Sequence, residues 1–294
     1  MSNHLRAGAT ATDDYALEIT PESAGWGFSG LRVLALAAGE RRALDTGEDE
    51  LVVVPLAGAC TVTVDGERFD LAGRDGVFAA VTDVLYAPRD ARLEIASEQG
   101  GRFALPSART ARRLEPVHVA AADVPVELRG AGSASRQVNN FCGPDAAFAE
   151  RLIAVEVLTP AGNWSSYPPH KHDEDVPGVE TALEEIYYYD VSDGPSGAPG
   201  FGYQRVYSSG PGRSIDVTAE VRSGDAIVMP HGWHGPSMAA PGYDLYYLNV
   251  MAGPGERAWR FRDDPDHAWI RDTWADQELD ERLPLTAAAG RTTR

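Results

Sequence analysis

The sequence predicts an all-β protein built from two similar β units. Short runs rich in β-branched and aromatic residues recur along the 294-residue chain, and Gly, Asp or Pro closes most of them. Long helical periodicity is absent. The two halves also share a weak repeat, in which a strand and a turn lead to an acidic pair that enters an apolar strand. In this repeat Glu50 of the first half corresponds to Glu185 of the second, and we expect the two units to join across roughly residues 107–150.

The N-terminal half contains five predicted strands. The sequence "VDGE" at 64–67 predicts a hairpin inside this series, because Asp-Gly readily supplies the positive φ values of a type I′ turn. The predicted strands span 31–39, 50–58, 60–73, 75–81 and 91–97.

The C-terminal half repeats this pattern with longer aromatic runs. Helical structure is predicted only for short pieces at 143–152 and 275–283. The predicted strands span 151–160, 184–191, 201–209, 225–230 and 244–253.

Composition excludes several classes of partner. The chain carries 26 basic and 44 acidic residues, a net charge of -18, which repels phosphate backbones and anionic membranes. The first twenty residues lack an apolar leader, and no later run approaches the roughly 20 apolar residues of a membrane span. We therefore expect a soluble cytoplasmic protein that binds a small molecule and neither nucleic acid nor membrane.

A candidate metal site lies in the second half. Successive side chains of a strand alternate between its faces, so His170 and His172 of "PPHKHD" point the same way and Lys171 points away. Glu185 begins the next strand, and His234 follows the turn "MPHGWHG". Three imidazoles and one carboxylate suit one divalent ion, with Zn first and Mn, Fe, Co or Ni as alternatives.

The segments "PPHKHD", "EEIYYY" and "GDAIVMPHGWH" resemble the two motifs of the cupin superfamily. The resemblance implies small double-sheet barrels that hold these four ligands inside. Twelve residues separate His172 from Glu185, where the general motif has three or four. This insertion leaves Glu174, Glu180 and Glu184 as alternatives for the acidic ligand.

Further segments narrow the resemblance to one family. "PPHKHDED", "GFGYQRVYS", "PGYDLYYLNVMAG" and "DPDHAWI" resemble the 5-deoxy-glucuronate isomerases of myo-inositol catabolism. The resemblance implies a bicupin, with two double-stranded β-helix (jelly-roll) barrels in one chain. The N-terminal cupin would span 1–145 and the C-terminal, metal-binding and catalytic cupin 146–294. No histidine lies between His4 and His118, so the N-terminal unit should lack metal ligands.

The family implies conversion of 5-deoxy-D-glucuronate into 5-dehydro-2-deoxy-D-gluconate. This reaction moves a proton from C2 to C1 and needs a general base near that carbon. We favour Glu156, in the strand before the site, and include Tyr189 among the catalytic residues. The other candidates are Glu184, His231, Tyr203 and Tyr207.

The substrate carboxylate calls for an arginine, whose fork can donate two parallel hydrogen bonds. We favour Arg205, which shares a strand face with Tyr203 and Tyr207, and keep Lys171 and Arg136 as alternatives. Three other functions stay open: a related uronate isomerase of the 4-deoxy-5-keto type, a cupin dioxygenase, and a non-catalytic sugar-binding cupin. Exposed strand edges also make a homodimer or larger homo-oligomer an expectation.

Overall fold

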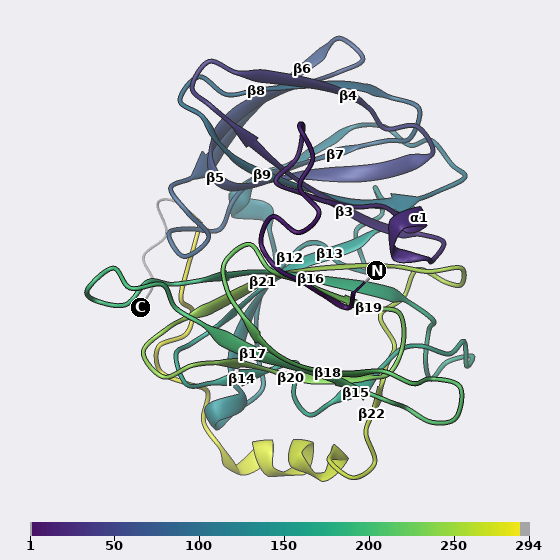
Figure 1. The fold of residues 1–294 in the computed structure, drawn as a ribbon, viewed down its shortest axis with the longest axis vertical. Helices are drawn as coiled ribbons and strands as arrows, with labels where there is room; N and C mark the ends of the chain where they lie inside the picture. Colours follow the sequence, from purple (N-terminus) through teal and green to yellow (C-terminus); the bar gives the residue numbers. More distant parts are fainter. Residues whose placement is uncertain (1, 289–294) are drawn as a thin grey trace.

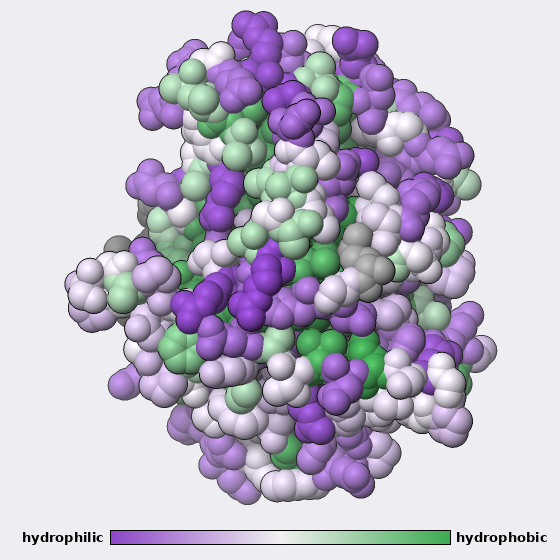
Figure 2. Space-filling model, viewed as in Figure 1, coloured by the Kyte–Doolittle hydropathy of each residue, from purple (hydrophilic) through white to green (hydrophobic). Residues whose placement is uncertain are grey.

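A computed structural model describes residues 2–288 and confirms the prediction of an all-β bicupin. Two curled β structures are stacked along the long axis, with the N-terminal residues in purple and blue above and the C-terminal residues in green and yellow below (Figure 1). On the same face hydrophilic residues are widespread, and patches of hydrophobic residues lie among them, near the middle and over both halves (Figure 2). Helical structure within the described residues is limited to α1 (Pro21–Ala24) and three 3-10 segments, η1 (Ala121–Asp123), η2 (Gly132–Ala134) and η3 (Ala268–Asp276).

The N-terminal barrel is one curled, nine-stranded antiparallel sheet. Its interior is filled by aliphatic side chains and Phe103, and none of the groups that could hold a metal lies there among the described residues. Its strands are β2 (Leu17–Ile19), β3 (Ser29–Leu36), β4 (Arg41–Asp45), β5 (Asp49–Val64), β6 (Glu67–Arg74), β7 (Val84–Ala87), β8 (Arg92–Ala96), β9 (Gly101–Arg109) and β10 (Val117–Val119).

The C-terminal barrel is built from a seven-stranded and a six-stranded sheet. The first contains β1 (His4–Leu5), β11 (Val126–Arg129), β12 (Arg136–Cys142), β13 (Ile153–Thr159), β16 (Glu184–Val191), β19 (Ala226–Met229) and β21 (Leu245–Ala252). The second contains β14 (Trp164–Ser165), β15 (His170–Lys171), β17 (Gly202–Tyr207), β18 (Asp216–Val221), β20 (Trp233–Ala239) and β22 (Arg262–Asp263).

The central strands β13, β16, β19 and β21 of the seven-stranded sheet are buried on both faces, which explains their nearly continuous apolar sequences. One face lines the C-terminal barrel, and the other packs against the N-terminal half in a shared core. Tyr187 and Tyr189 of β16 lie in the barrel core, whereas Ile186 and Tyr188 lie in the shared core. Successive side chains of this strand therefore alternate between the two cores.

The sheets do not follow a boundary at residue 145. Strands β11 and β12 precede that residue but belong to the C-terminal sheet, and β1, at the start of the chain, pairs with β19 of the same sheet. The N-terminal segment thus crosses from the second barrel to the first.

Local predictions had mixed outcomes. The hairpin is confirmed, because Asp65 and Gly66 join β5 to β6 with φ values of 49° and 93°. Residues 75–81 form turns and an isolated bridge instead of a strand, and 143–152 contain no helix. Helical turns occur at 268–276, ahead of the predicted 275–283. No helix among the described residues is long and apolar enough to cross a membrane.

Candidate metal centre and its cavity

The backbone of β16 delivers Glu185 to the inside of the C-terminal barrel. Its register pairs Glu185 with Met229 of β19 and Met251 of β21, so the carboxylate lies in the middle of a sheet. The side chain is fully buried. A carboxylate in this position needs compensating partners, because burial of an unpaired charge is costly.

Two histidines lie next to this carboxylate. Glu185 Oε2 lies 3.2 Å from His172 Nε2 and 3.0 Å from His234 Nε2. One ligand atom from each residue lies within 4.8 Å of the others, and all three side chains are buried. This is the spacing of groups that could share one small cation.

His170 completes the cluster from the neighbouring strand. It lies opposite His234 in the pairing of β15 with β20, and the centroids of their rings are 4.4 Å apart. Its ring is also 4.8 Å from that of Phe261, which places it at the edge of the group. The structure therefore places the fourth predicted ligand, His170, beside His234 but outside the group of three whose ligand atoms lie within 4.8 Å of one another.

The donor atoms fit a metal ion. Backbone carbonyls hold Nδ1 of each ring: Pro168 O at 3.1 Å for His170, Leu183 O at 3.2 Å for His172 and Gly232 O at 3.4 Å for His234. These contacts fix the rings and leave Nε2 as the free nitrogen. Nε2 of His172 and His234 and both Glu185 oxygens are buried without a hydrogen-bond partner. Buried polar atoms normally have partners, so these atoms form a set of donors that could hold a cation.

The charge states suit the same role. Burial lowers the pKa of His234 to about 3, and burial together with His172 holds the pKa of His170 well below its usual value. Burial alone would raise the pKa of Glu185, but His234 and His172 hold it below its usual range. Glu185, in contrast, raises the pKa of His172 despite its burial. A metal coordinates neutral imidazoles and an ionised carboxylate, so its binding would displace a proton from His172.

The insertion between His172 and Glu185 folds back on itself. Lys171 points away from the histidines, and its Nζ donates to Asp173, Glu174 and Glu180 at 2.7 to 2.8 Å. Glu180 also accepts the backbone N–H groups of residues 173 and 174. This ion cluster holds the two ends of the insertion together. The chain therefore returns to His172 at Leu183, two residues before Glu185.

The other acidic candidates are thereby used elsewhere. Glu174 and Glu180 bind Lys171, as described. Glu184 points out of the barrel, where it accepts the backbone N–H groups of Gly27, Phe28 and Ser29 at 2.7 to 2.8 Å. Of the four acids considered from sequence, only Glu185 reaches the histidines.

The structure does not bring Glu156 to the site. β13 places Val155 and Val157 in the barrel core and turns Glu156 toward the N-terminal half. There its carboxylate forms a buried ion pair with Arg74 and accepts from Tyr246 Oη at 2.9 Å. A general base must reach the substrate carbon, so this position is incompatible with the role predicted for Glu156.

The prediction for Arg205 also fails, because its side chain lies on the outer face of its strand. Tyr203, Arg205 and Tyr207 do share a face of β17, but this face is the outer one, and the Arg205 guanidinium stacks on Tyr207 at 4.0 Å. Gln204 and Val206 face inward instead. Tyr207 Oη donates to Asp264, outside the barrel.

The remaining aromatic and histidine candidates differ in position. Tyr189 is fully buried in the barrel, but its hydroxyl donates to Gln204 Oε1 at 2.9 Å and does not line the cavity described below. His231 lies close to His172 and His234, with Nε2 3.3 Å from Ser214 O.

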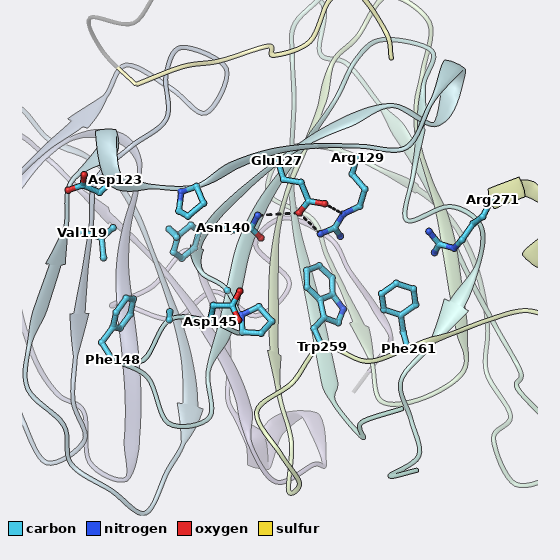
Figure 3. A pocket seen from close by; sticks show the side chains of 15 residues that line it. Val119, Asp123, Glu127, Arg129, Asn140, Asp145, Phe148, Trp259, Phe261 and Arg271 are labelled. Atoms are coloured by element: carbon cyan, nitrogen blue, oxygen red, sulfur yellow. Dashed lines mark hydrogen bonds and ion pairs between the residues drawn. The ribbon is translucent and has the colours of Figure 1, made fainter. Parts of the chain in front are cut away.

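A cavity in the barrel opens beside His170. Tyr187, Tyr247 and Asn249 of the barrel line it together with Arg129, Arg136 and Arg271. The cavity has a volume of about 30 Å³ and shares Arg129, Trp259, Phe261 and Arg271 with a neighbouring groove of about 710 Å³, shown in Figure 3.

Sequence reasoning missed Arg129, Arg271 and Trp259, and ranked Arg136 behind Arg205. The dense run of aromatic residues and arginines in "WRFRDDPDHAWIR" at 259–271 was the signal for two of them.

Comparison with known proteins decides the family. The model of the KduI/IolB family matches residues 4–270. The chain belongs to the KduI/IolB family. A 5-deoxy-glucuronate isomerase from Geobacillus kaustophilus (strain HTA426) is 41% identical over 264 residues, covering 87% of this chain and 91% of the relative. The enzyme of the same name from Bacillus subtilis (strain 168) is 38% identical over 255 residues, covering 86% and 91%. The resemblance and the isomerase class inferred from sequence are confirmed.

Solved structures agree. An IolB-like protein from Salmonella typhimurium LT2 is 37% identical with a TM-score of 0.83, over 91% of this chain and 98% of that one. An oxalate decarboxylase from Lactobacillus farciminis shares the fold at 13% identity, with a TM-score of 0.62 over 88% of both chains.

Proposed function

We propose that this member of the KduI/IolB family is a metal-dependent aldose-ketose isomerase that converts 5-deoxy-D-glucuronate into 5-dehydro-2-deoxy-D-gluconate. The relatives' names support the substrate. The observation that carries the metal dependence is the set of buried, unpartnered donor atoms on His172, Glu185 and His234. The other such group among the described residues, Asp173, Glu174 and Glu180, already binds Lys171.

His170, His172, Glu185 and His234 would hold one divalent ion, with Zn first and Mn, Fe, Co or Ni as alternatives. When bound, the ion supplies Lewis-acid stabilisation of the negative charge that develops on the substrate oxygen during enolisation. The reaction moves one proton from C2 to C1 and changes no metal oxidation state.

The chain's own residues orient the sugar. Tyr187 lines the cavity, and its hydroxyl lies 3.3 Å from Ser166 Oγ. Burial and the neighbouring Glu185 raise the pKa of Tyr187 well above its usual value. Tyr187 therefore stays protonated and acts as a hydrogen-bond donor to a substrate oxygen, not as the base. Tyr247 and Asn249 of β21 line the same wall and can bind further hydroxyl groups.

Incubation of purified protein with 5-deoxy-D-glucuronate tests this proposal. Formation of the ketose should be followed together with dioxygen concentration. We expect ketose formation without oxygen uptake. Oxygen consumption stoichiometric with turnover would instead identify a dioxygenase, and turnover of a 4-deoxy-5-keto-uronate alone would identify a different uronate isomerase.

A further inference from the structure

Three arginines converge where the groove meets the cavity. Arg129 ends β11, Arg136 begins β12 and Arg271 lies in η3. All three line the cavity that His170 borders. In Figure 3, Arg129 and Arg271 lie near Trp259 and Phe261 at one end of the groove.

Two of these cations are paired in register. Arg129 lies directly opposite Arg136 in the antiparallel ladder of β11 and β12. Like charges directly opposite each other in a sheet are destabilising. Without a ligand, the two guanidinium groups repel each other and destabilise the fold. An anion bound between them would attract both and replace this repulsion by a net attraction.

Only Arg136 lacks a carboxylate within the described part of the chain. Arg129 donates two hydrogen bonds to Glu127, and Arg271 donates to Asp263. The Arg136 side chain is almost fully buried, and its one hydrogen bond goes to Ala134 O at 3.0 Å. A contact with the Trp274 ring at 5.8 Å is the remaining partner.

The buried guanidinium is nevertheless charged at neutral pH. Burial lowers the pKa of Arg136 to about 10, which is still far above 7. A buried, charged and largely unpaired side chain is expensive unless a ligand satisfies it. A cation-π contact at this distance offsets only a small part of the cost.

We propose that Arg136 binds the carboxylate of the sugar-acid substrate, and that Arg129 and Arg271 supply the surrounding positive field. This inference rests on the proposed function for the identity of the sugar. Arg136 and His170 line the same cavity of about 30 Å³, which shares Arg129 and Arg271 with the larger groove. A sugar acid that extends from the groove into this cavity would direct its carboxylate to Arg136 and its C1 and C2 to the histidines.

Arg136 would therefore set specificity for acids over neutral sugars. A fork that donates two parallel hydrogen bonds to a carboxylate has no equivalent partner in a primary alcohol. The matched neutral substrate is 5-deoxy-D-glucose, in which a hydroxymethyl group replaces the carboxylate.

Steady-state kinetics of Arg136→Gln and Arg136→Lys test the proposal. We expect kcat/KM for 5-deoxy-D-glucuronate to fall by about 10- to 100-fold in Arg136→Gln, mainly through KM, because charge-assisted hydrogen bonds are lost. Turnover of 5-deoxy-D-glucose and the bound metal content should not change. Arg136→Lys should stay impaired. Arg205→Gln, which removes an exposed arginine from the outer face, is the matched control and should behave like the wild type.

Equal losses for the acid and the neutral sugar, or an unchanged KM for the acid, would overturn the assignment. If Arg136→Gln does not fold, Arg136→Lys carries the same comparison. Calorimetric titration with D-glucuronate separates this proposal from the isomerase proposal. If binding depends on Arg136 but the protein has no isomerase activity, the proposed reaction is wrong and the role of Arg136 in carboxylate binding stands. If the protein is an isomerase but binding does not depend on Arg136, only the role of Arg136 is wrong.

Discussion

Arg74 of the N-terminal barrel and Glu156 of the C-terminal barrel form an ion pair that is completely buried between the two halves, with Arg74 Nη1 3.2 Å from Glu156 Oε2. Tyr246 and Asn139 donate to the same carboxylate at 2.9 and 3.1 Å. Arg74 also donates to the carbonyl oxygens of Pro55 and Ala80. The pair thus joins the barrels through a saturated polar network inside an apolar core.

Removing the Glu156 side chain should destabilise the protein without abolishing its catalytic activity. Glu156→Ala leaves the Arg74 charge buried and unpaired, and we expect the free energy of unfolding to fall by about 3–5 kcal/mol. Urea denaturation measures this loss, and kcat of the folded variant should stay close to the wild-type value. A large loss of kcat with unchanged stability would restore Glu156 as the general base.

Glu184 and Glu185 are adjacent in sequence and should have opposite phenotypes. Glu184→Gln weakens three hydrogen bonds to the backbone of residues 27–29, so we expect about 1–3 kcal/mol lower stability and full metal content. Glu185→Gln should lose the metal, because an amide is a poorer ligand than a carboxylate at the centre of the cluster. Elemental analysis of the purified variants checks both. Equal metal content in the two variants would mean that Glu185 is not a ligand.

Metal binding should stabilise the folded protein. A ligand that binds only the native state adds about 2.7 kcal/mol at a free concentration 100 times its Kd. We expect a chelator to lower the Tm and added divalent ion to restore it, as followed by thermal unfolding. His172→Ala and His234→Ala should show no such metal-dependent shift. A Tm that is insensitive to chelation in wild-type protein would count against a structural contribution of the ion.

The sequence was sufficient for features that depend on local alternation. Side chains two residues apart on a strand point to the same face. This places His170 with His172, and it places Tyr187 and Tyr189 inside the barrel once Glu185 is assigned to the inside. The same period could not decide the direction of Glu156. Residues 153–159 are buried on both faces, so hydrophobicity along β13 does not distinguish the barrel from the shared core.

Two other errors have different physical origins. The face of β17 that carries Arg205 is polar because it is solvated, and polarity alone does not distinguish a solvated face from a wet barrel interior. Arg136 reaches the cavity only because β11 and β12 join the C-terminal sheet, a long-range pairing that local sequence does not encode. The repeat did not reveal this pairing.

The most direct test of the account is turnover of 5-deoxy-D-glucuronate by the same preparation before and after metal removal. We predict that the purified protein carries about one divalent ion per chain, that chelation abolishes ketose formation, and that addition of Zn or another of the suited ions restores it. Full ketose formation by metal-free protein would contradict the central claim that His170, His172, Glu185 and His234 form the catalytic metal centre.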